Sequence, residues 1–223
     1  MFTGIIEEIG RIDQVRQSGE AIVMNIAAKK VLSDVALGDS IAVNGVCLTV
    51  TSYTNHSFTV DLMPETVRAT SLNGLGRGAK VNLERAMSAK GRFGGHFVSG
   101  HVDGIGKIIS KEPKDNAVYY TIEVSDDLRH YMVHKGSVAV DGTSLTIFGV
   151  DETSFTISII PHTIEETIIG SKGVGDIVNI ECDMIGKYIE QFLTRKKSPT
   201  KKSSQPIKQT SLSEQFLSEH GFK

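Results

Sequence analysis

Ile41-Ala-Val-Asn-Gly-Val-Cys-Leu-Thr49 has a near copy later in the chain, Val138-Ala-Val-Asp-Gly-Thr-Ser-Leu-Thr146. The match extends without a gap over 41–87 and 138–184, and 17 of the 47 aligned pairs are identical. A second pair of blocks, Met1–Ile12 and Phe97–Ile108, matches in the same order at a spacing shorter by one residue. A unit of about 95 residues exceeds a solenoid repeat and suits a small domain with its own core. The sequence therefore predicts a duplicated domain that has lost one loop residue.

Each half contains short runs, rich in Thr, Val, Ile, Phe and Tyr, in which many polar and apolar residues alternate as in half-buried strands. The runs are Ala21–Ala27, Ser40–Val43, Cys47–Tyr53, Ser57–Met63 and Lys80–Arg85, then Ala117–Val124, Ser137–Val140, Ser144–Val150, Ser154–Ile160 and Ile177–Cys182. Asn44-Gly45 and Asp141-Gly142 favour hairpin turns, because these residues tolerate positive φ. Short, regularly spaced strands predict an all-β fold of two similar six-stranded antiparallel Greek-key barrels. We expect barrels at 1–97 and 98–195, with 88–95 as a glycine-rich linker.

The period changes after the second repeat. An apolar stripe at helical spacing predicts a C-terminal α-helix over about 184–195; it consists of Met184, Ile185, Tyr188, Ile189, Phe192 and Leu193. The stripe is compatible with packing on the second barrel or on another subunit. Residues 196–223 are predicted to form a disordered tail. Its apolar residues, Leu212, Phe216, Leu217 and Phe222, form either a docking peptide or a tail without function.

Bulk properties exclude several classes of protein. The net charge of −2 and the pI near 6.4 do not suit a phosphate-backbone binder. No apolar run is long enough to span a bilayer, and the N-terminus lacks the pattern of a signal peptide. Cys47 and Cys182 provide no disulfide framework. We expect a soluble cytoplasmic protein.

Common chemical motifs are weak or absent. Asn73-Gly-Leu-Gly-Arg-Gly78 has the wrong spacing for a dinucleotide fingerprint. His96 and His101 have no convincing further ligands for zinc, and ordinary polar turn residues are the simpler interpretation. The repeated polar positions are more informative: Thr3 with Ser99, Cys47 with Ser144, Thr49 with Thr146, and Thr66 with Thr163. Each hydroxyl alone is ordinary for a strand, but the repetition favours two related sites for a polyhydroxylated ligand.

Five segments together resemble one family. They are Met1-Phe-Thr-Gly-Ile-Ile-Glu7, Asn44-Gly-Val-Cys-Leu-Thr-Val50, Asp61-Leu-Met-Pro-Glu-Thr66, Gly94-Gly-His-Phe-Val-Ser-Gly-His101 and Asp141-Gly-Thr-Ser-Leu-Thr146. From residue 1 to about 195, the chain resembles the alpha-subunit riboflavin synthases. Members of that family contain two lumazine-binding repeats. The resemblance implies transfer of a four-carbon unit between two molecules of 6,7-dimethyl-8-ribityllumazine. Riboflavin and 5-amino-6-(D-ribitylamino)uracil are the products, and neither cofactor nor metal is implied.

The resemblance also implies partners. Family members are homotrimers whose C-terminal helices pack together, and whose sites form between the first barrel of one subunit and the second barrel of another. In some members the synthase is enclosed by a shell of lumazine synthase, and the tail motif of this chain is a candidate anchor.

The family's site residues map onto both repeats. The first pocket would use Gly4, Ile5, Ile6, Val46, Cys47, Leu48, Thr49, Asp61, Leu62, Met63, Pro64, Glu65 and Thr66. The second would use Gly100, His101, Val102, Lys135, Ser144, Leu145, Thr146, Ser158, Ile159, Ile160, Pro161, His162 and Thr163. His101 is the candidate acid/base, because the reference pKa of histidine is near neutrality. Candidate helpers are Cys47, Ser40 and Asp183, and Phe2 is a candidate cover for the bound ring.

Two other functions compete with this interpretation. One is a non-catalytic lumazine- or flavin-binding fluorescent protein of the same superfamily, which would tend to lose polar residues in one repeat. In this chain both repeats keep their polar residues, so the catalytic function is favoured. The other is the flavin-binding barrel of a reductase, which is disfavoured because no nicotinamide-binding domain follows.

Overall fold

The computed structural model describes residues 1–18, 21–194, 218–219 and 221. The predicted tail and its apolar motif lie almost entirely outside these residues. Among the described helices, none has the length and apolar character needed to cross a membrane.

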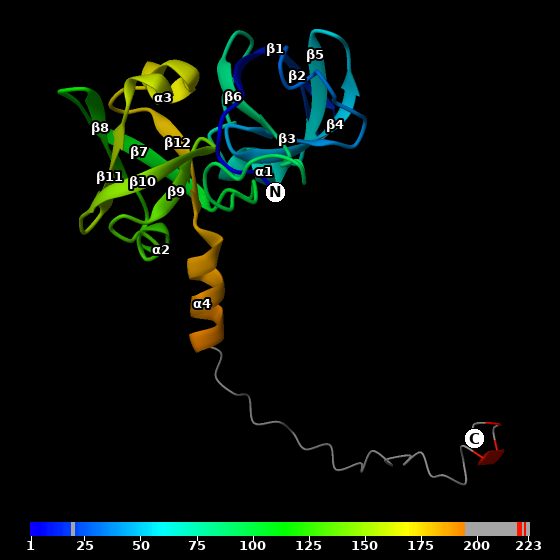
Figure 1. The fold of residues 1–223 in the computed structure, drawn as a ribbon. Helices are drawn as coiled ribbons and strands as arrows, with labels where there is room; N and C mark the ends of the chain where they lie inside the picture. Colours follow the sequence, from blue (N-terminus) through cyan, green and yellow to red (C-terminus); the bar gives the residue numbers. More distant parts are fainter. Residues whose placement is uncertain (19–20, 195–217, 220, 222–223) are drawn as a thin grey trace. The chain divides into compact units, whose positions relative to one another are not determined.

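Two closed antiparallel barrels lie side by side, as the sequence predicts (Figure 1). The first consists of β1 (Glu8–Ser18), β2 (Ala21–Ala27), β3 (Ser40–Val43), β4 (Val46–Tyr53), β5 (Ser57–Leu62) and β6 (Lys80–Arg85). The second consists of β7 (Gly104–Lys114), β8 (Ala117–Glu123), β9 (Ser137–Val140), β10 (Thr143–Val150), β11 (Ser154–Ile159) and β12 (Ile177–Cys182). The strands run β1-β2-β5-β4-β3-β6 in the first barrel, and the equivalent strands of the second have the same neighbours. The six-stranded barrels and their duplication are confirmed.

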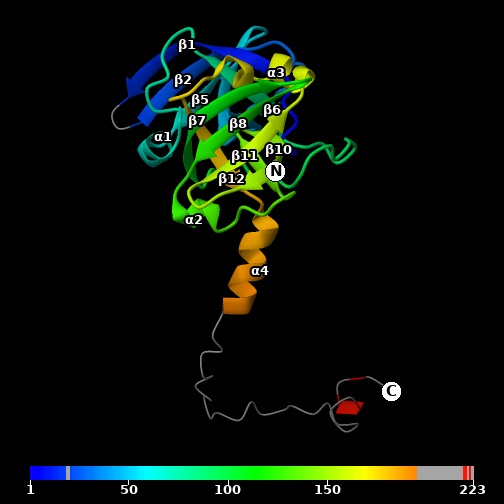
Figure 2. The same ribbon diagram turned by 90° about the vertical axis from the view of Figure 1, so that its left-hand side faces the viewer.

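Short helices connect the strands. They are α1 (Pro64–Ala69), α2 (Asp126–Arg129), α3 (Pro161–Glu166) and the 3₁₀ helix η1 (Ile168–Ser171). α1 and α3 occupy equivalent places after β5 and β11, and each begins at a proline, whose fixed φ suits the first turn. Figure 2 views the molecule from the side of the second barrel.

Each barrel has its own apolar core, centred on residues such as Phe58 and Phe155. A third, smaller cluster joins the barrels and consists of Phe2, Ala42, Val98 and Ala139. The two hairpin turns meet at this junction. A Cβ added to Gly45 would lie 2.7 Å from the backbone nitrogen of Gly142, so only glycine allows these turns to approach so closely.

One asparagine from each barrel donates a hydrogen bond to the hairpin turn of the other barrel. Asn82 Nδ2 donates to the carbonyl of Asp141 at 2.9 Å, and Asn179 Nδ2 donates to the carbonyl of Asn44 at 2.8 Å. The Asp141 turn departs from the pseudo-twofold symmetry, because its fully buried carboxylate forms an ion pair with Lys172 at 2.8 Å. The equivalent residues in the first repeat, Asn44 and Leu75, carry no charge.

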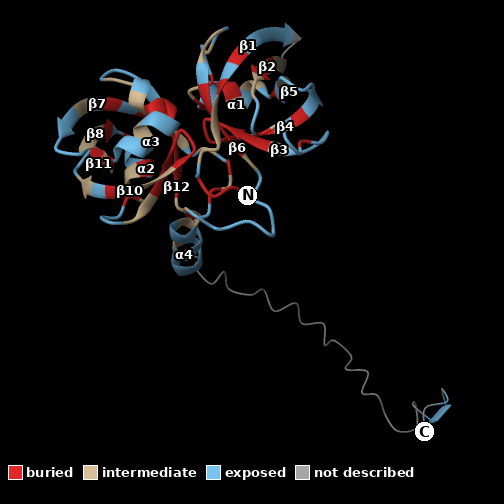
Figure 3. Ribbon diagram, turned by 45° about the horizontal axis from the view of Figure 1, so that its top comes forward, coloured by how far each residue is buried: buried red, intermediate tan, exposed pale blue. Residues whose placement is uncertain are grey.

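The predicted C-terminal helix is present as α4 (Met184–Thr194). Its polar side is anchored to the second barrel: Lys187 pairs with Asp103, and Glu190 accepts one hydrogen bond from Tyr131 and contacts His130. Within the stripe, Ile185, Tyr188 and Ile189 are exposed by 51%, 59% and 53%. Figure 3 shows most of α4 in the colour of exposed residues. Both alternatives for the stripe, packing on the second barrel and packing on another subunit, stay predictions.

Candidate functional site

The leading segment of each repeat crosses to the other barrel. The backbones of Phe2 and Val98 form a two-way bridge, with N···O distances of 2.7 and 3.2 Å. Beyond this bridge, Ser144 N donates to Gly4 O at 2.8 Å, and Cys47 N donates to Gly100 O at 2.8 Å. Residues 1–6 therefore reach the β9–β10 hairpin, and residues 97–102 reach the β3–β4 hairpin.

Each leading segment therefore contacts both barrels. Gly4 bonds to the hairpin of the second barrel, and Gly100 bonds to the hairpin of the first. Val102 packs against the core of the first barrel. The predicted assignment of each leading segment to the pocket of its own repeat stays a prediction.

Two carboxylates, to which the sequence assigned no role, hold the crossing segments. Glu84 accepts from the backbone N and the hydroxyl of Thr3, at 2.7 and 2.8 Å, and from Gly4 N at 3.0 Å. Glu181 makes the equivalent bonds to Ser99 and Gly100, at 2.6, 2.7 and 3.0 Å. Burial raises the pKa of Glu84, and the Thr3 and Gly4 hydrogen bonds oppose that shift. The Val-Asn-x-Glu motif, which occurs at 81–84 and again at 178–181, was the signal by which the sequence could have identified both residues.

The four threonines predicted to bind ligand keep their hydroxyls free. Thr49 and Thr146 are exposed on β4 and β10, and Thr66 and Thr163 lie in α1 and α3 with partial exposure. Within the described part of the chain, no hydrogen bond involves any of these four hydroxyls. Cys47 and Ser144 lie two residues before Thr49 and Thr146, and therefore on the same faces of their strands.

The predicted catalytic residues lie in different environments. His101 is exposed, and its backbone N donates to Ser99 Oγ at 3.2 Å. Ser40 pairs with Thr49 between β3 and β4, and Asp183 accepts from Ile185 N at the start of α4. Phe2 is fully buried in the junction cluster.

Lys135, which was predicted for the second pocket, has an unusual backbone conformation. Lys135 is exposed, and its φ of 63° lies in the left-handed region.

His96, which the sequence treated as an ordinary turn residue, is buried at the junction. Its Nδ1 lies 2.7 Å from Ser144 Oγ, and its backbone N donates to Thr3 O at 3.1 Å. Burial lowers the pKa of His96, and the negative charge of Asp183 opposes that shift. Gly94-Gly95 immediately before it was the available signal, because paired glycines permit a close backbone approach.

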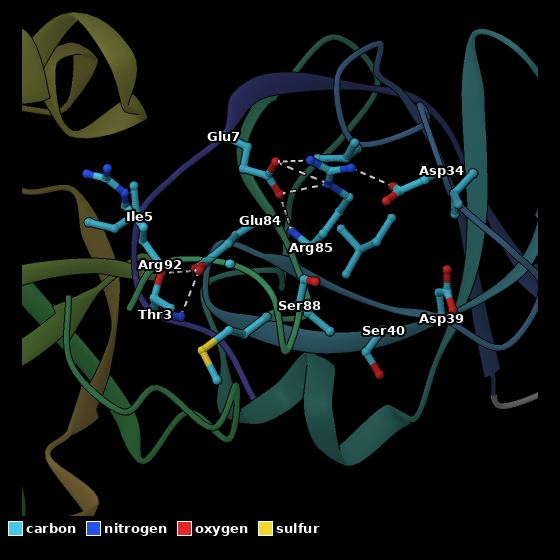
Figure 4. Close-up of a pocket in the computed structure, with 16 residues that line it drawn as sticks. Thr3, Ile5, Glu7, Asp34, Asp39, Ser40, Glu84, Arg85, Ser88 and Arg92 are labelled. Carbon is cyan, nitrogen blue, oxygen red and sulfur yellow. Dashed lines mark hydrogen bonds and ion pairs between the residues drawn. The ribbon is translucent and has the colours of Figure 1, made fainter. Parts of the chain in front are cut away.

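One cavity of about 380 Å³ opens on the first barrel (Figure 4). Three of its charged groups pair with one another: Arg85 donates to Glu7 and Asp34, with shortest N···O distances of 2.5 Å. The two carboxylates raise the pKa of Arg85 above its usual range. Burial acts to raise the pKa of Glu7, but the hydrogen bonds and charge of Arg85 outweigh burial and lower that pKa. Only Ile5 and Ser40 of the predicted site line this cavity, so we interpret it as a structural ion network. Among the described residues, no group of three or more His, Cys, Asp and Glu side chains is arranged to hold a metal ion.

The two closed six-stranded barrels, with leading segments that cross between them, place the chain in the class of duplicated-barrel proteins. The family model for the lumazine binding domain matches twice, at residues 3–86 and 99–183. The riboflavin synthases of Bacillus amyloliquefaciens and Bacillus subtilis (strain 168) are 60% and 58% identical over 222 residues, covering 100% of each chain. The chain belongs to the riboflavin synthase family, and the resemblance seen in the sequence is confirmed.

A solved structure supports the fold. LumP complexed with riboflavin aligns with a TM-score of 0.76 at 23% identity, covering 82% of this chain and 99% of that chain.

Proposed function

We propose that this chain is an enzyme of riboflavin synthesis, a transferase that moves a four-carbon unit between two molecules of 6,7-dimethyl-8-ribityllumazine. The products are riboflavin and 5-amino-6-(D-ribitylamino)uracil. The full-length identity of 60% to a riboflavin synthase carries this proposal. The atoms of two substrate molecules equal those of the two products, so the transfer consumes neither an oxidant nor water.

The duplicated architecture suits a reaction between two identical molecules. Two related pockets hold the donor and the acceptor, and their positioning replaces a bimolecular encounter. Such positioning contributes about 7–11 kcal/mol of a barrier. The free hydroxyls of Thr49, Thr66, Thr146 and Thr163 are suited to the ribityl chain and the pyrimidine ring, because they have no competing partners within the described chain.

The two proposed pockets follow the two repeats. The first combines Gly4, Ile5 and Ile6 with residues 46–49 and 61–66. The second combines Gly100, His101 and Val102 with Lys135 and residues 144–146 and 158–163. His101 remains our candidate for proton transfer, and its backbone is anchored through Ser99 to Glu181. Cys47, Ser40 and Asp183 remain candidate helpers.

Phe2 has a more defined place in this proposal. Because it is fully buried between the barrels, we propose that it supports the backbone of both pockets as well as the bound ring. Its side chain lies 2.8 Å from the position of a Cβ added to Gly100, so it packs directly against the leading segment that contains Gly100.

The assembly follows from the exposed stripe of α4. We propose a homotrimer in which these stripes pack together, because an exposed apolar helix face of this kind is usually covered by a partner. Residues 210–223 are our candidate anchor inside a lumazine synthase shell, and their deletion is expected to abolish co-assembly without loss of activity. We place the enzyme in the cytoplasm, which suits two free thiols, Cys47 and Cys182.

The direct test is to mix the purified full chain with 6,7-dimethyl-8-ribityllumazine, without metal or nucleotide, and follow the appearance of riboflavin. One riboflavin per two substrate molecules is expected. Tight retention of lumazine without turnover would instead support the non-catalytic binding protein.

The proton-transfer role is tested with His101→Gln, which is expected to lower kcat while the oligomeric state is retained. His56→Gln is the matched control, because His56 is exposed in the turn between β4 and β5. Equal turnover of His101→Gln and the control would remove His101 from the mechanism.

A further inference from the structure

The buried imidazole of His96 has one partner and one unsatisfied nitrogen. Nδ1 lies 2.7 Å from Ser144 Oγ, whereas Nε2 is buried without any hydrogen-bond partner. The residue is only 8% exposed. Polar groups in such surroundings are normally satisfied, and an exception calls for a reason.

The unsatisfied nitrogen favours one tautomer. A neutral imidazole carries its proton on one nitrogen and a lone pair on the other. Orphaned buried N–H donors are rarer in proteins than under-satisfied buried acceptors. The tautomer that leaves no buried N–H without an acceptor carries the proton on Nδ1. In this tautomer, Nδ1–H donates to Ser144 Oγ.

This bond determines what Ser144 offers to a ligand. A serine hydroxyl has one proton and two acceptor lone pairs. Because His96 occupies an acceptor position of Oγ, the hydroxyl proton is free to point elsewhere. Ser144 shares a face of β10 with Thr146, whose side chain is exposed and free. The proton of Ser144 is thus available on the face that we assign to the second pocket.

We propose that His96 is a positioning residue of the second pocket, where it fixes Ser144 as a hydrogen-bond donor to a carbonyl oxygen or ring nitrogen of the bound lumazine. This inference rests on the proposed function. The backbone supports the arrangement, because a Cβ added to Gly95 would lie only 1.9 Å from Thr3 O and 3.0 Å from Ser144 Oγ. The close approach of Gly95 therefore holds His96 next to Ser144 and next to the leading segment that contains Thr3.

The same arrangement makes the two pockets unequal. Cys47, the equivalent of Ser144, makes no side-chain hydrogen bond within the described part of the chain, and a thiol is a weak donor. The second pocket therefore has a fixed, strong donor where the first has none. A reaction that assigns different roles to two identical molecules requires such a difference.

The first experiment measures kcat and KM for riboflavin formation by full-length wild type, His96→Leu and His96→Asn. Leucine removes the donor, and kcat is expected to fall about tenfold, the upper range for one neutral hydrogen bond. The asparagine amide can replace Nδ1–H and is expected to restore kcat to within about threefold of wild type. A purely structural role predicts no such rescue, and unchanged kcat in His96→Leu would overturn the proposal.

A double-mutant cycle separates positioning from general packing. If His96 acts through Ser144, His96→Leu has no further effect on kcat in a Ser144→Ala background. Additive losses would contradict the proposal. The exposed His56→Leu serves as the control for handling and substitution type.

The third measurement uses the wild-type chain, so its result does not depend on the folding of a His96 variant. Nitrogen-15 NMR of the wild-type chain distinguishes the tautomers, and we expect His96 to be protonated at Nδ1. Protonation at Nε2 alone would make Ser144 the donor to His96 and would refute the proposal. If wild type itself formed no riboflavin, the proposed function would fail, whereas an active wild type with the wrong tautomer would refute only the role of His96.

Discussion

Removing one charge of the Asp141–Lys172 ion pair is expected to destabilise the junction strongly. At an effective dielectric constant of about 20, charges 2.8 Å apart attract by about 6 kcal/mol. Burial of the carboxylate opposes this by several kcal/mol, so the net contribution of the intact pair is small. A single substitution leaves the other charge uncompensated, and the free energy of unfolding is expected to fall by about 3–5 kcal/mol.

The two single variants are expected to differ. In Asp141→Asn, Lys172 has 17% of its side chain exposed and can turn toward water, which places the loss near the lower limit. In Lys172→Leu, the carboxylate is fully buried and cannot do so. Burial already raises the pKa of Asp141 and Lys172 lowers it, so loss of Lys172 raises that pKa further. Because a raised carboxyl pKa favours the folded state only where the group is protonated, the loss in Lys172→Leu shrinks as the pH falls.

The double variant Asp141→Asn/Lys172→Leu provides the decisive comparison, because it reproduces the uncharged pair Asn44 and Leu75 of the first repeat. Asn44 Oδ1 accepts from Asn82 N at 2.7 Å, just as Asp141 Oδ1 accepts from Asn179 N at 2.8 Å, so asparagine keeps this bond. Its stability is expected to lie within about 1 kcal/mol of wild type, since replacing both charges of a buried pair is often neutral.

Urea unfolding, followed by circular dichroism at one protein concentration, measures all four proteins at pH 8 and pH 5. Losses in the single variants that add up in the double variant would refute the electrostatic account.

Three further perturbations test the junction and the assembly. Gly95→Ala is expected to lower stability by about 1–3 kcal/mol, because the new methyl group would overlap Thr3 O; thermal unfolding should show no comparable loss for Gly76→Ala, whose added Cβ meets nothing within 4 Å. Burial lowers the pKa of His96, so the unfolded chain takes up a proton that the folded chain resists as the pH falls below about 6.5. Wild type should therefore lose more stability than His96→Asn over that range, and parallel pH profiles would contradict this. Ile189→Glu places a charge in the exposed stripe of α4 and is expected to shift the proposed trimer toward monomer in light scattering, whereas Gln191→Glu should not; a trimeric Ile189→Glu protein would exclude the stripe as the interface.

Local patterns predicted most of the barrels. Alternation and the Asn44-Gly45 and Asp141-Gly142 turns located ten strands, and the positive φ values of both turns confirm the hairpins. β1 and β7 were not located as strands. Each contains a register shift, at Ile12/Gln14 and Ile108/Ser110, which interrupts the period of two on which the prediction depends.

The crossing of the leading segments could not be read from local sequence. Nothing in residues 1–6 indicates which hairpin they pair with, because the choice depends on how two finished barrels pack. The role of His96 was hidden for the same reason. In sequence it neighbours Gly95 and Phe97, whereas its defining partner, Ser144, lies far along the chain on the other side of the junction.

The departures from symmetry are concentrated where the barrels meet. Duplication produces two equivalent barrels, and Glu84 and Glu181 preserve that equivalence by holding both crossing segments in the same way. Two identical substrates in two identical pockets would have no reason to take different roles. The His96–Ser144 contact introduces a difference beside one pocket, and the Asp141–Lys172 pair introduces another in the adjoining turn. If these differences set the roles, Ser144→Cys in a His96→Leu background, which makes the second pocket resemble the first, should lower kcat more than it weakens lumazine binding, and an equal loss of both would show that the asymmetry serves binding alone.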